Sequence, residues 1–402
     1  MKTEVSTDDL ALGGARREVL IALGLSAGAA VALGFSRFAY GLLLPPMRAD
    51  LGWTYAEAGA LNTANGAGYI VGALLAASAA RRYGTARAFL VGFAISVLVL
   101  LLTAATRNLS MLFALRTIGG AATALCFILG AGLAAAICPA QDPLRRGLLV
   151  GIYVAGVSIG LLLSGVAIPL ILQGGAQNWP EGWIALGLLA AAGLPMAWRS
   201  AREVPVPTSG SMAMLTGPQF RQLAPTFIGY GLFGAGYAGY MTFIIALLQQ
   251  QGGSADQVIW FWLVLGLVSA VSTLMWGRYL GAFKGGRGPA LVYAIAALGA
   301  LPLLIFPGPV AMLLSAILFG GSFLAGPTST AIVAQRQLPA AAWTAAISLM
   351  TVGFAFGQTV SPILAGAISD ATASIAAGFW VSSLLLGCAA CVNLLQRPAT
   401  AD

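Results

Sequence analysis

VGFAISVLVLLLTAA, residues 91–105, is an unbroken apolar run without a charged side chain. Leu384–Leu395 is a second run of this kind, and similar runs recur along the chain. Of the 402 residues, 59% are hydrophobic and 8% are charged, whereas roughly a quarter of a soluble domain is charged. A spanning helix needs about 20 mainly apolar residues, so the chain can hold about twelve. We therefore predict an all-α integral membrane protein with twelve transmembrane helices.

Breaks between the apolar runs place the spans. We expect helices over residues 19–45, 54–79, 87–105, 109–137, 146–172, 182–199, 223–249, 258–280, 288–306, 309–335, 343–368 and 375–396. The predicted organisation is a cytoplasmic N-terminal tail (1–18), an N-terminal six-helix bundle (19–199), a cytoplasmic linker (200–222), a C-terminal six-helix bundle (223–396) and a cytoplasmic C-terminal tail (397–402). The linker is polar and contains prolines, so we expect it to be the most protease-sensitive cytoplasmic segment.

Loop charges predict the orientation. The formal net charge is +8, but Lys and Arg stand singly or in pairs between apolar runs and form no patch for nucleic acid. Cytoplasmic loops of membrane proteins carry the excess of Lys and Arg. With both termini inside, only Arg48 and Arg107 among the Lys and Arg residues of the loops lie outside. We predict a multi-pass protein of the cytoplasmic (inner) membrane with both termini cytoplasmic.

The two halves of the chain share a pattern. Adding the same constant to the residue number aligns residues of the first half with similar residues of the second half. Arg81, Gly84 and Arg87 align with Arg278, Gly281 and Lys284, and Gly156, Gly160 and Ser164 align with Gly353, Gly357 and Ser361. Gly34 and Tyr40 align with Gly231 and Tyr237. An even number of helices separates the partners, so the two repeats run parallel. Small residues at regular helical spacing let neighbouring backbones approach closely. The pattern predicts a 6+6 arrangement with a pseudo-twofold axis.

Several motifs resemble a known superfamily. RRYGTAR at Arg81–Arg87 and RTIGG at Arg116–Gly120 are similar to the loop after helix 2 and the buried arginine motif of the major facilitator superfamily. GFSRFAY at Gly34–Tyr40, LLPPM at Leu43–Met47 and ANGAGY at Ala64–Tyr69 resemble the opening of its YbfB/YjiJ-type branch. The resemblance implies the major facilitator fold, with helices 1 and 4 lining a central cavity. It also implies transport of a solute by alternating access.

Two arginines lie within predicted spans. Arg37 is in the first helix and Arg116 is in the fourth, both at a similar depth below the outer face. A charge at the centre of a membrane helix costs about 2.5–3.5 kcal/mol on insertion scales, so each must face protein or water. One interpretation is an anion clamp, because a guanidinium matches carboxylate or phosphate as a fork. The other is structural, with each arginine hydrogen-bonded to backbone carbonyls.

Further candidates for the solute path are amides and aromatic residues. They are Asn62, Asn65 and Tyr69 in the second helix, Tyr237 and Tyr240 in the seventh, and Gln358 in the eleventh. Buried amides need hydrogen-bond partners, so they either line the path or join neighbouring helices. The tyrosines have the same two interpretations, solute binding or packing.

The sequence offers few groups for coupling or catalysis. It contains no His, and Glu57 is the acid nearest to mid-membrane, either as a coupling group or as an acid favoured at a helix N-terminus. Cys388 and Cys391 lack the further ligands of a zinc site. We therefore predict no catalytic residues, no metal, no cofactor and no enzymatic activity. A co-transported proton or ion, a proton carried by the solute, uniport and exchange all stay open.

The resulting hypothesis is a secondary active or facilitative transporter for a small organic solute, with an organic anion as the favoured class. We expect it to work as a monomer in the lipid bilayer. The alternative is an exporter of amphiphilic or drug-like compounds, for which an apolar, aromatic cavity would suffice. A membrane receptor or enzyme without transport is a third class, disfavoured by the 6+6 repeat.

Overall fold

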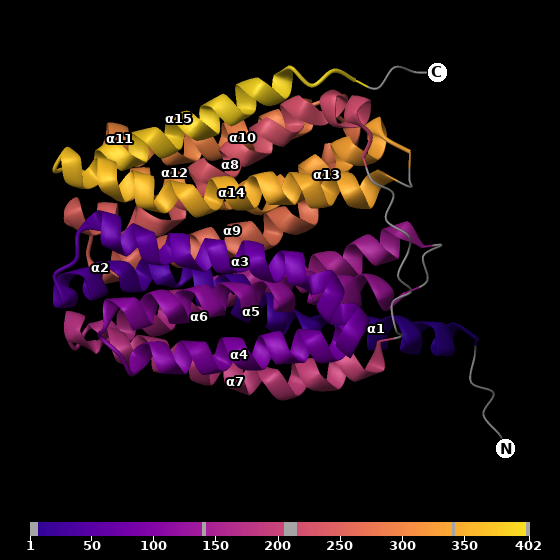
Figure 1. The fold of residues 1–402 in the computed structure, drawn as a ribbon, viewed down its shortest axis with the longest axis horizontal. Helices are drawn as coiled ribbons and strands as arrows, with labels where there is room; N and C mark the ends of the chain where they lie inside the picture. Colours follow the sequence, from indigo (N-terminus) through magenta and orange to yellow (C-terminus); the bar gives the residue numbers. More distant parts are fainter. Residues whose placement is uncertain (1–6, 139–141, 205–214, 340–341, 399–402) are drawn as a thin grey trace.

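The computed structural model describes residues 7–138, 142–204, 215–339 and 342–398. The first half of the chain contains α1 (Thr7–Ala29), η1 (Ala30–Phe38), α2 (Tyr40–Leu51), α3 (Tyr55–Tyr83), α4 (Thr85–Ala104), α5 (Leu109–Ala136), α6 (Pro143–Leu172), η2 (Ala176–Asn178) and α7 (Trp179–Glu203). The second half contains α8 (Gly217–Gln250), α9 (Ala255–Tyr279), η3 (Leu280–Ala282), α10 (Arg287–Ala300), α11 (Pro302–Ile305), α12 (Pro309–Gly320), η4 (Phe323–Ala325), α13 (Gly326–Gln337), α14 (Trp343–Ala371) and α15 (Ile375–Leu394). In the described part of the chain every regular element is helical, and the helices lie roughly side by side (Figure 1).

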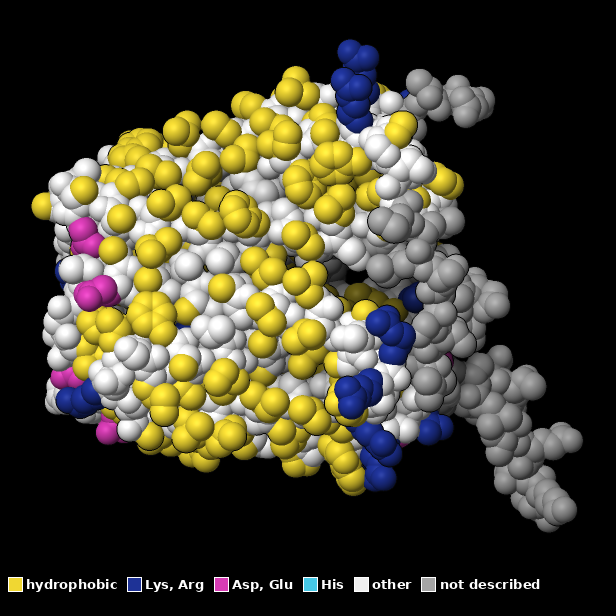
Figure 2. All heavy atoms as spheres, viewed as in Figure 1, with side chains coloured by type: hydrophobic (Ala, Val, Ile, Leu, Met, Phe, Trp, Pro, Cys, Tyr) yellow, Lys and Arg dark blue, Asp and Glu magenta, His cyan; other side chains and the backbone are white. Residues whose placement is uncertain are grey.

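The prediction of an all-α protein with twelve spans is confirmed. Eleven helical segments of the described chain are long and apolar enough to cross a membrane, the first being α1, η1 and α2 together over Gly14–Leu51. The remaining long helix is the 29-residue α3, whose asparagines and threonine make it more polar. Hydrophobic side chains cover the flanks of the molecule between its two ends (Figure 2), as contact with lipid hydrocarbon requires.

Some helix boundaries differ from the predicted ones. Helix begins at Thr7 instead of residue 19, because polar residues can extend a helix beyond its apolar run. Two predicted spans are interrupted: the ninth between α10 and α11, where Pro302 follows, and the tenth between α12 and α13. Proline removes a backbone donor and cannot continue the preceding hydrogen-bond ladder.

The predicted linker is shorter than residues 200–222. The helix α7 runs to Glu203, and α8 begins at Gly217 after Thr216, which forms a reciprocal capping box with Gln219. Such a cap, together with proline in the first turn, starts a helix before the apolar run begins. Residues 205–214, in the middle of the predicted protease-sensitive segment, lie outside the described residues.

The same glycine contact occurs in both halves. A Cβ at Gly34 would lie 2.6 Å from Gly160 Cα, and a Cβ at Gly357 would lie 2.1 Å from Gly231 O. These are the residues that the constant shift in numbering aligns, so the repeat has a counterpart in packing. The loops differ in detail. Gly84 ends α3 with φ 86°, whereas Gly281 lies in η3 and the positive φ falls on Gly285.

Alanine substitutions at the first pair of equivalent glycines should differ in cost, because the two contacts differ in closeness. Gly34→Ala places a methyl group 2.6 Å from Gly160 Cα, whereas at Gly231 the nearest atom, Gly353 O, is 3.3 Å away. Overpacking typically costs about 1–3 kcal/mol. We expect Gly34→Ala to lower the melting temperature of the purified protein by several degrees and Gly231→Ala to lower it less. Equal melting temperatures would contradict the contact.

The two halves touch mainly at one end of the molecule. We call the end where α1 begins and α15 ends the terminal end, and the other the closed end (Figure 1). At the closed end a Cβ at Gly41 would lie 2.6 Å from Met241 O, and a Cβ at Gly59 would lie 2.2 Å from Pro362 O. Midway, Ser158 Oγ is 2.9 Å from Ser269 Oγ. Nearer the terminal end the molecule is hollowed between the halves (Figure 2).

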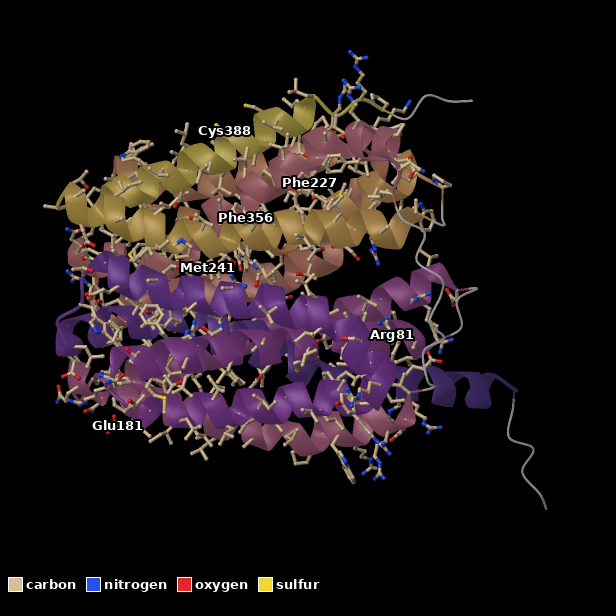
Figure 3. The ribbon with its side chains drawn as sticks, in the orientation of Figure 1. Arg81, Glu181, Phe227, Met241, Phe356 and Cys388 are labelled. Atoms are coloured by element: carbon tan, nitrogen blue, oxygen red, sulfur yellow. The ribbon has the colours of Figure 1, made fainter. Side chains whose placement is uncertain are left out.

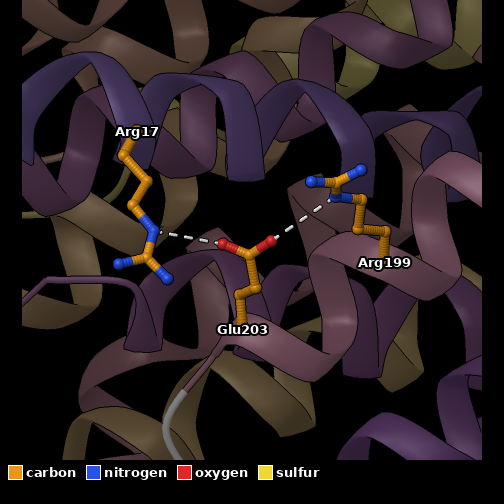
Figure 4. A network of polar contacts seen from close by, with 3 residues as sticks. All are labelled: Arg17, Arg199 and Glu203. Atoms are coloured by element: carbon orange, nitrogen blue, oxygen red, sulfur yellow. Dashed lines mark hydrogen bonds and ion pairs between the residues drawn. The ribbon is translucent and has the colours of Figure 1, made fainter.

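Charged side chains are concentrated at the two ends. At the terminal end the Glu203 carboxylate lies 3.1 Å from Arg17 Nε and 3.8 Å from Arg199 Nε (Figure 4). At the closed end Arg107 Nη2 lies 3.5 Å from Asp50 Oδ2. These pairs are partly exposed and each contributes on the order of 1 kcal/mol or less. None of these pairs involves the two buried arginines within the membrane spans.

Candidate functional site

The first span carries a π-helical segment. It is the nine-residue η1, after which Ala39 N–H donates to Gly34 O at 2.9 Å, five residues earlier. π-helical turns are rare and often mark functional positions. Nearly every side chain of η1 is buried, and Gly34 packs against Gly160 of α6. Arg37 is therefore presented by an irregular turn that is held in place by close backbone packing.

Arg37 is a buried cation for which the described part of the chain provides no hydrogen-bond acceptor at Nη2. Its side chain is 5% exposed, and its Nη2 is buried without a hydrogen bond to any described residue. No ion pair within the described residues involves it. The closest aromatic contact is with Tyr69 of α3, whose ring centroid is 5.9 Å from Arg37 Cζ. A buried charge of this kind is costly unless another group binds it.

Arg116 has the opposite environment. Its Nη1 donates to Ser36 O at 2.6 Å, its Nε to Leu61 O at 3.5 Å, and its Nη2 to Asn62 Oδ1 at 3.3 Å. Its Cζ also lies 4.6 Å from the ring centroid of Tyr40. The guanidinium thus joins η1, α3 and α5 inside the first half. This environment matches the structural interpretation of Arg116 and contrasts with Arg37, whose Nη2 has no hydrogen bond to a described residue.

The two asparagines of α3 have different roles. Asn65 Nδ2 donates to Arg116 O at 3.2 Å, which joins α3 to α5 within one half. Asn62 Nδ2 donates to Thr242 Oγ1 of α8 at 2.6 Å, while its Oδ1 accepts from Arg116. Asn62 therefore connects the buried arginine of the first half to the second half.

Tyr237 belongs to an aromatic cluster, which we define as Tyr230, Phe233, Tyr237, Phe323 and Phe354. The ring of Tyr237 stacks on Phe233, Phe323 and Phe354 with centroids 5.6–6.1 Å apart. Phe38, the residue after Arg37, meets Tyr237 edge-on at 6.1 Å and Phe323 at 5.8 Å. Such pairs each contribute roughly 0.5–1.5 kcal/mol beyond burial. Arg37 is thus one residue from the point where the aromatic cluster reaches the first half.

Of the remaining predicted site residues, Tyr240 and Glu57 are held in local structure, and Gln358 lies beside a contact between the two halves. Tyr240 is fully buried against Phe319, 3.7 Å between centroids, and its hydroxyl lies 2.6 Å from Ser315 Oγ. Gln358 is 1% exposed, next to Thr359, which packs against Gly66. Glu57 forms a capping box, in which its Oε2 accepts from Thr54 N–H at 2.9 Å. That geometry matches the helix-starting interpretation of Glu57.

Sequence reasoning missed the residues that join the halves. Thr242 accepts the Asn62 amide, and Asp370, at the end of α14, accepts from Tyr55 N–H at 2.9 Å and Ala56 N–H at 2.7 Å. Met241, beside Thr242, lies where the halves face each other (Figure 3). Threonine in an apolar helix and aspartate near a helix end are common, so nothing in their local sequence indicates a partner across the interface.

Comparisons with known proteins agree with this architecture. The family model described as "Uncharacterised MFS-type transporter YbfB" matches residues 29–394. The chain is 29% identical over 390 residues to a chloramphenicol resistance protein of Streptomyces lividans, covering 91% of this chain and 94% of that protein.

Solved structures share the fold at low sequence identity. A bacterial homolog of the human lysosomal transporter Spinster, in an inward-facing and unoccupied conformation, has a TM-score of 0.72 at 17% identity, covering 96% of this chain and 99% of that chain. The nucleoside transporter NupG has a TM-score of 0.71 at 16% identity, with 94% and 98% covered. A D-xylose–proton symporter has 0.72 at 17%, with 95% and 98% covered.

Proposed function

This chain belongs to the YbfB-type family of major facilitator superfamily transporters, and from that premise we propose that it moves a small organic anion anchored by Arg37. The observation that carries the proposal is that Arg37, only 5% exposed, has an Nη2 without a hydrogen bond to any described residue. A guanidinium has five N–H donors in a fixed fork and pairs best with carboxylate or phosphate. An anionic solute would supply the missing acceptors.

The proposed mechanism is alternating access between the two bundles. The contacts of Gly41 with Met241 and of Gly59 with Pro362 support a state closed at one end and hollowed toward the other. Arg37 and the contact of Phe38 with Tyr237 lie where both halves contribute side chains. Both alternating bundles belong to one chain, so we propose that a monomer is sufficient.

The proposed setting is the cytoplasmic (inner) membrane, with both chain ends on the cytoplasmic side. Lys and Arg gather mainly at the terminal end, and most of the acidic side chains in view lie at the closed end (Figure 2). This distribution supports a cytoplasmic terminal end by the rule that positive residues stay inside. In this orientation the structure would be open to the cytoplasm. The proposal includes no cofactor and leaves the coupling ion, if any, to flux measurements under imposed pH and ion gradients.

A second candidate function is export of drug-like compounds. The resemblance to a chloramphenicol resistance protein supports it, as do the stacked rings of the aromatic cluster beside Arg37. Under this alternative the aromatic cluster would bind the solute, and a neutral compound would bind as tightly as an anion. The two functions therefore differ in whether binding depends on the charge of the ligand.

A thermal-shift comparison of matched ligands tests this difference. We expect organic carboxylates to raise the melting temperature of the purified protein, and their neutral amides to have little effect. A ligand at about 100 times its Kd adds about 2.7 kcal/mol of stability. The carboxylate-induced shift should vanish in Arg37→Ala. Equal stabilisation by the carboxylate and its amide would favour the drug-export function instead. In either case, transport of the stabilising ligand can then be measured in proteoliposomes.

A further inference from the structure

Two adjoining recesses lie at the terminal end of the second half. The first, which we call the basic cavity, has a volume of about 520 Å³ and is lined by Phe283, Lys284, Ser329, Arg336 and Gln337 among others. The second, which we call the apolar groove, has a volume of about 510 Å³ and is lined by Met275, Trp276, Tyr279, Phe283, Leu291 and Gly321 among others. Phe283 lines both recesses, so a single molecule could reach from one into the other.

The apolar groove lies between two membrane helices. Both α9 and α10 pack against α12, and α9 and α10 have little contact with each other. Trp276 Nε1 donates to Gly321 O, directly after α12, at 2.6 Å, which joins two residues of the groove lining. The Met275 and Tyr279 side chains are 49% and 58% exposed. Trp and Tyr are typical of the level of lipid headgroups, so Trp276 and Tyr279 place the groove where a lipid chain enters the hydrocarbon.

The basic cavity has positive charge, and none of its described lining residues is acidic. Arg336 donates from Nη1 to Phe283 O and from Nη2 to Gly281 O, which holds its guanidinium beside the segment between α9 and α10. A guanidinium has five N–H donors, so others stay available for a ligand. Neither Lys284 nor Arg336 forms an ion pair with a described residue. Asp256 and Asp370 are the acids between residues 217 and 398, and both lie at the closed end.

We propose that the basic cavity and the apolar groove together bind one anionic phospholipid. Lys284 and Arg336 would contact the phosphate, and one acyl chain would lie between α9 and α10. The charge of the cavity selects an anion, and the position of the groove in a membrane span selects an acyl chain over a water-soluble ligand. This site is separate from Arg37 and does not depend on which solute is transported.

Native mass spectrometry of the full chain in detergent tests the site. Dioleoyl phosphatidylglycerol, dioleoyl phosphatidylcholine and glycerol 3-phosphate would each be titrated. We expect one tightly retained phosphatidylglycerol, with an apparent affinity at least about fivefold above that of phosphatidylcholine, and no retained glycerol 3-phosphate. Fivefold corresponds to the roughly 1 kcal/mol that one Lys or Arg contributes at a membrane surface.

Variants distinguish a site from general surface charge. Lys284→Gln should weaken phosphatidylglycerol retention about fivefold, and Leu291→Trp should weaken it by filling the groove. The matched control is Arg87→Gln, because Arg87 is the residue that the repeat aligns with Lys284 in the other half. This variant should retain phosphatidylglycerol as the wild type does. Equal retention of phosphatidylcholine by the wild type, an equal loss in Arg87→Gln, or binding of glycerol 3-phosphate would each overturn the proposal.

Discussion

Arg37→Ala should abolish most solute transport while leaving the protein folded. Under the proposed function, Arg37 makes charged hydrogen bonds to the solute, and such bonds are each worth about 1.5–3 kcal/mol. The loss of one corresponds to a decrease of about 10- to 150-fold in the uptake rate at low solute concentration. In the absence of solute, Arg37 Nη2 has no hydrogen bond to lose. The melting temperature without ligand should therefore fall little.

Arg37→Lys separates charge from geometry. Lysine keeps the positive charge but loses the planar fork that matches a carboxylate. An anchoring role predicts that Arg37→Lys loses most transport, as Arg37→Ala does. If only the charge mattered, Arg37→Lys would transport normally, and the proposed fork would be wrong.

Arg116→Ala is the matched control for a buried arginine. It removes the donors that satisfy Ser36 O and Leu61 O and the contact with Asn62 Oδ1. Leaving buried acceptors unpaired costs about 1–3 kcal/mol each. We expect a clear drop in melting temperature for Arg116→Ala, unlike Arg37→Ala. If Arg37→Ala also fails to fold, Arg37 is structural and the anchoring role fails with it.

The membrane fold is readable from sequence because lipid imposes a single simple requirement. Every spanning backbone must satisfy its own hydrogen bonds, so each apolar run of sufficient length becomes a helix. That is why runs such as 91–105 predict α4 to within a few residues of its bounds. The π-helical η1 and the breaks near Pro302 and Gly321 are not readable in this way. They depend on neighbouring helices that accept the displaced backbone.

The candidate site is predictable only in part. The sequence identifies Arg37 and Arg116 as costly charges in membrane spans, but gives them the same two interpretations. Their environments differ because Arg116 lies opposite the carbonyls of Ser36 and Leu61 and Arg37 does not. Such partners come from helix packing, which a single sequence does not reveal. Residue type alone likewise cannot show that Asn62 bonds across the interface and Asn65 within one half.

Asp370 forms hydrogen bonds between the two bundles at the closed end, and we call this contact the latch. It belongs to α14 of the second half, and its two carboxylate oxygens accept from the first two N–H groups of α3 in the first half, at 2.9 and 2.7 Å. The free N–H groups at a helix N-terminus carry partial positive charge, so a carboxylate there is favoured. Opening the closed end would separate Asp370 from α3. Its removal should therefore favour the open state.

Asp370→Ala should raise the accessibility of the closed end. The reporter is Met241→Cys, because Met241 is 4% exposed and its carbonyl faces Gly41 across the interface. In protein whose four native cysteines are replaced by alanine, the rate of maleimide labelling in nanodiscs measures how often this end opens. Two partly exposed charged hydrogen bonds contribute on the order of 1–2 kcal/mol, so labelling should accelerate about 5- to 30-fold.

The matched control is Asp256→Ala. Asp256 is also an acid at the closed end, in the first turn of α9, but no ion pair within the described residues joins it to the first half. Its removal changes the local charge equally and should leave the labelling rate of Met241→Cys unchanged. Asp370→Asn, which keeps one carbonyl acceptor, should be intermediate because one backbone N–H of α3 can still be paired. If Asp370→Ala and Asp256→Ala label at the same rate, the latch is disproved, and the apolar contacts of Gly41 and Gly59 alone hold this end closed.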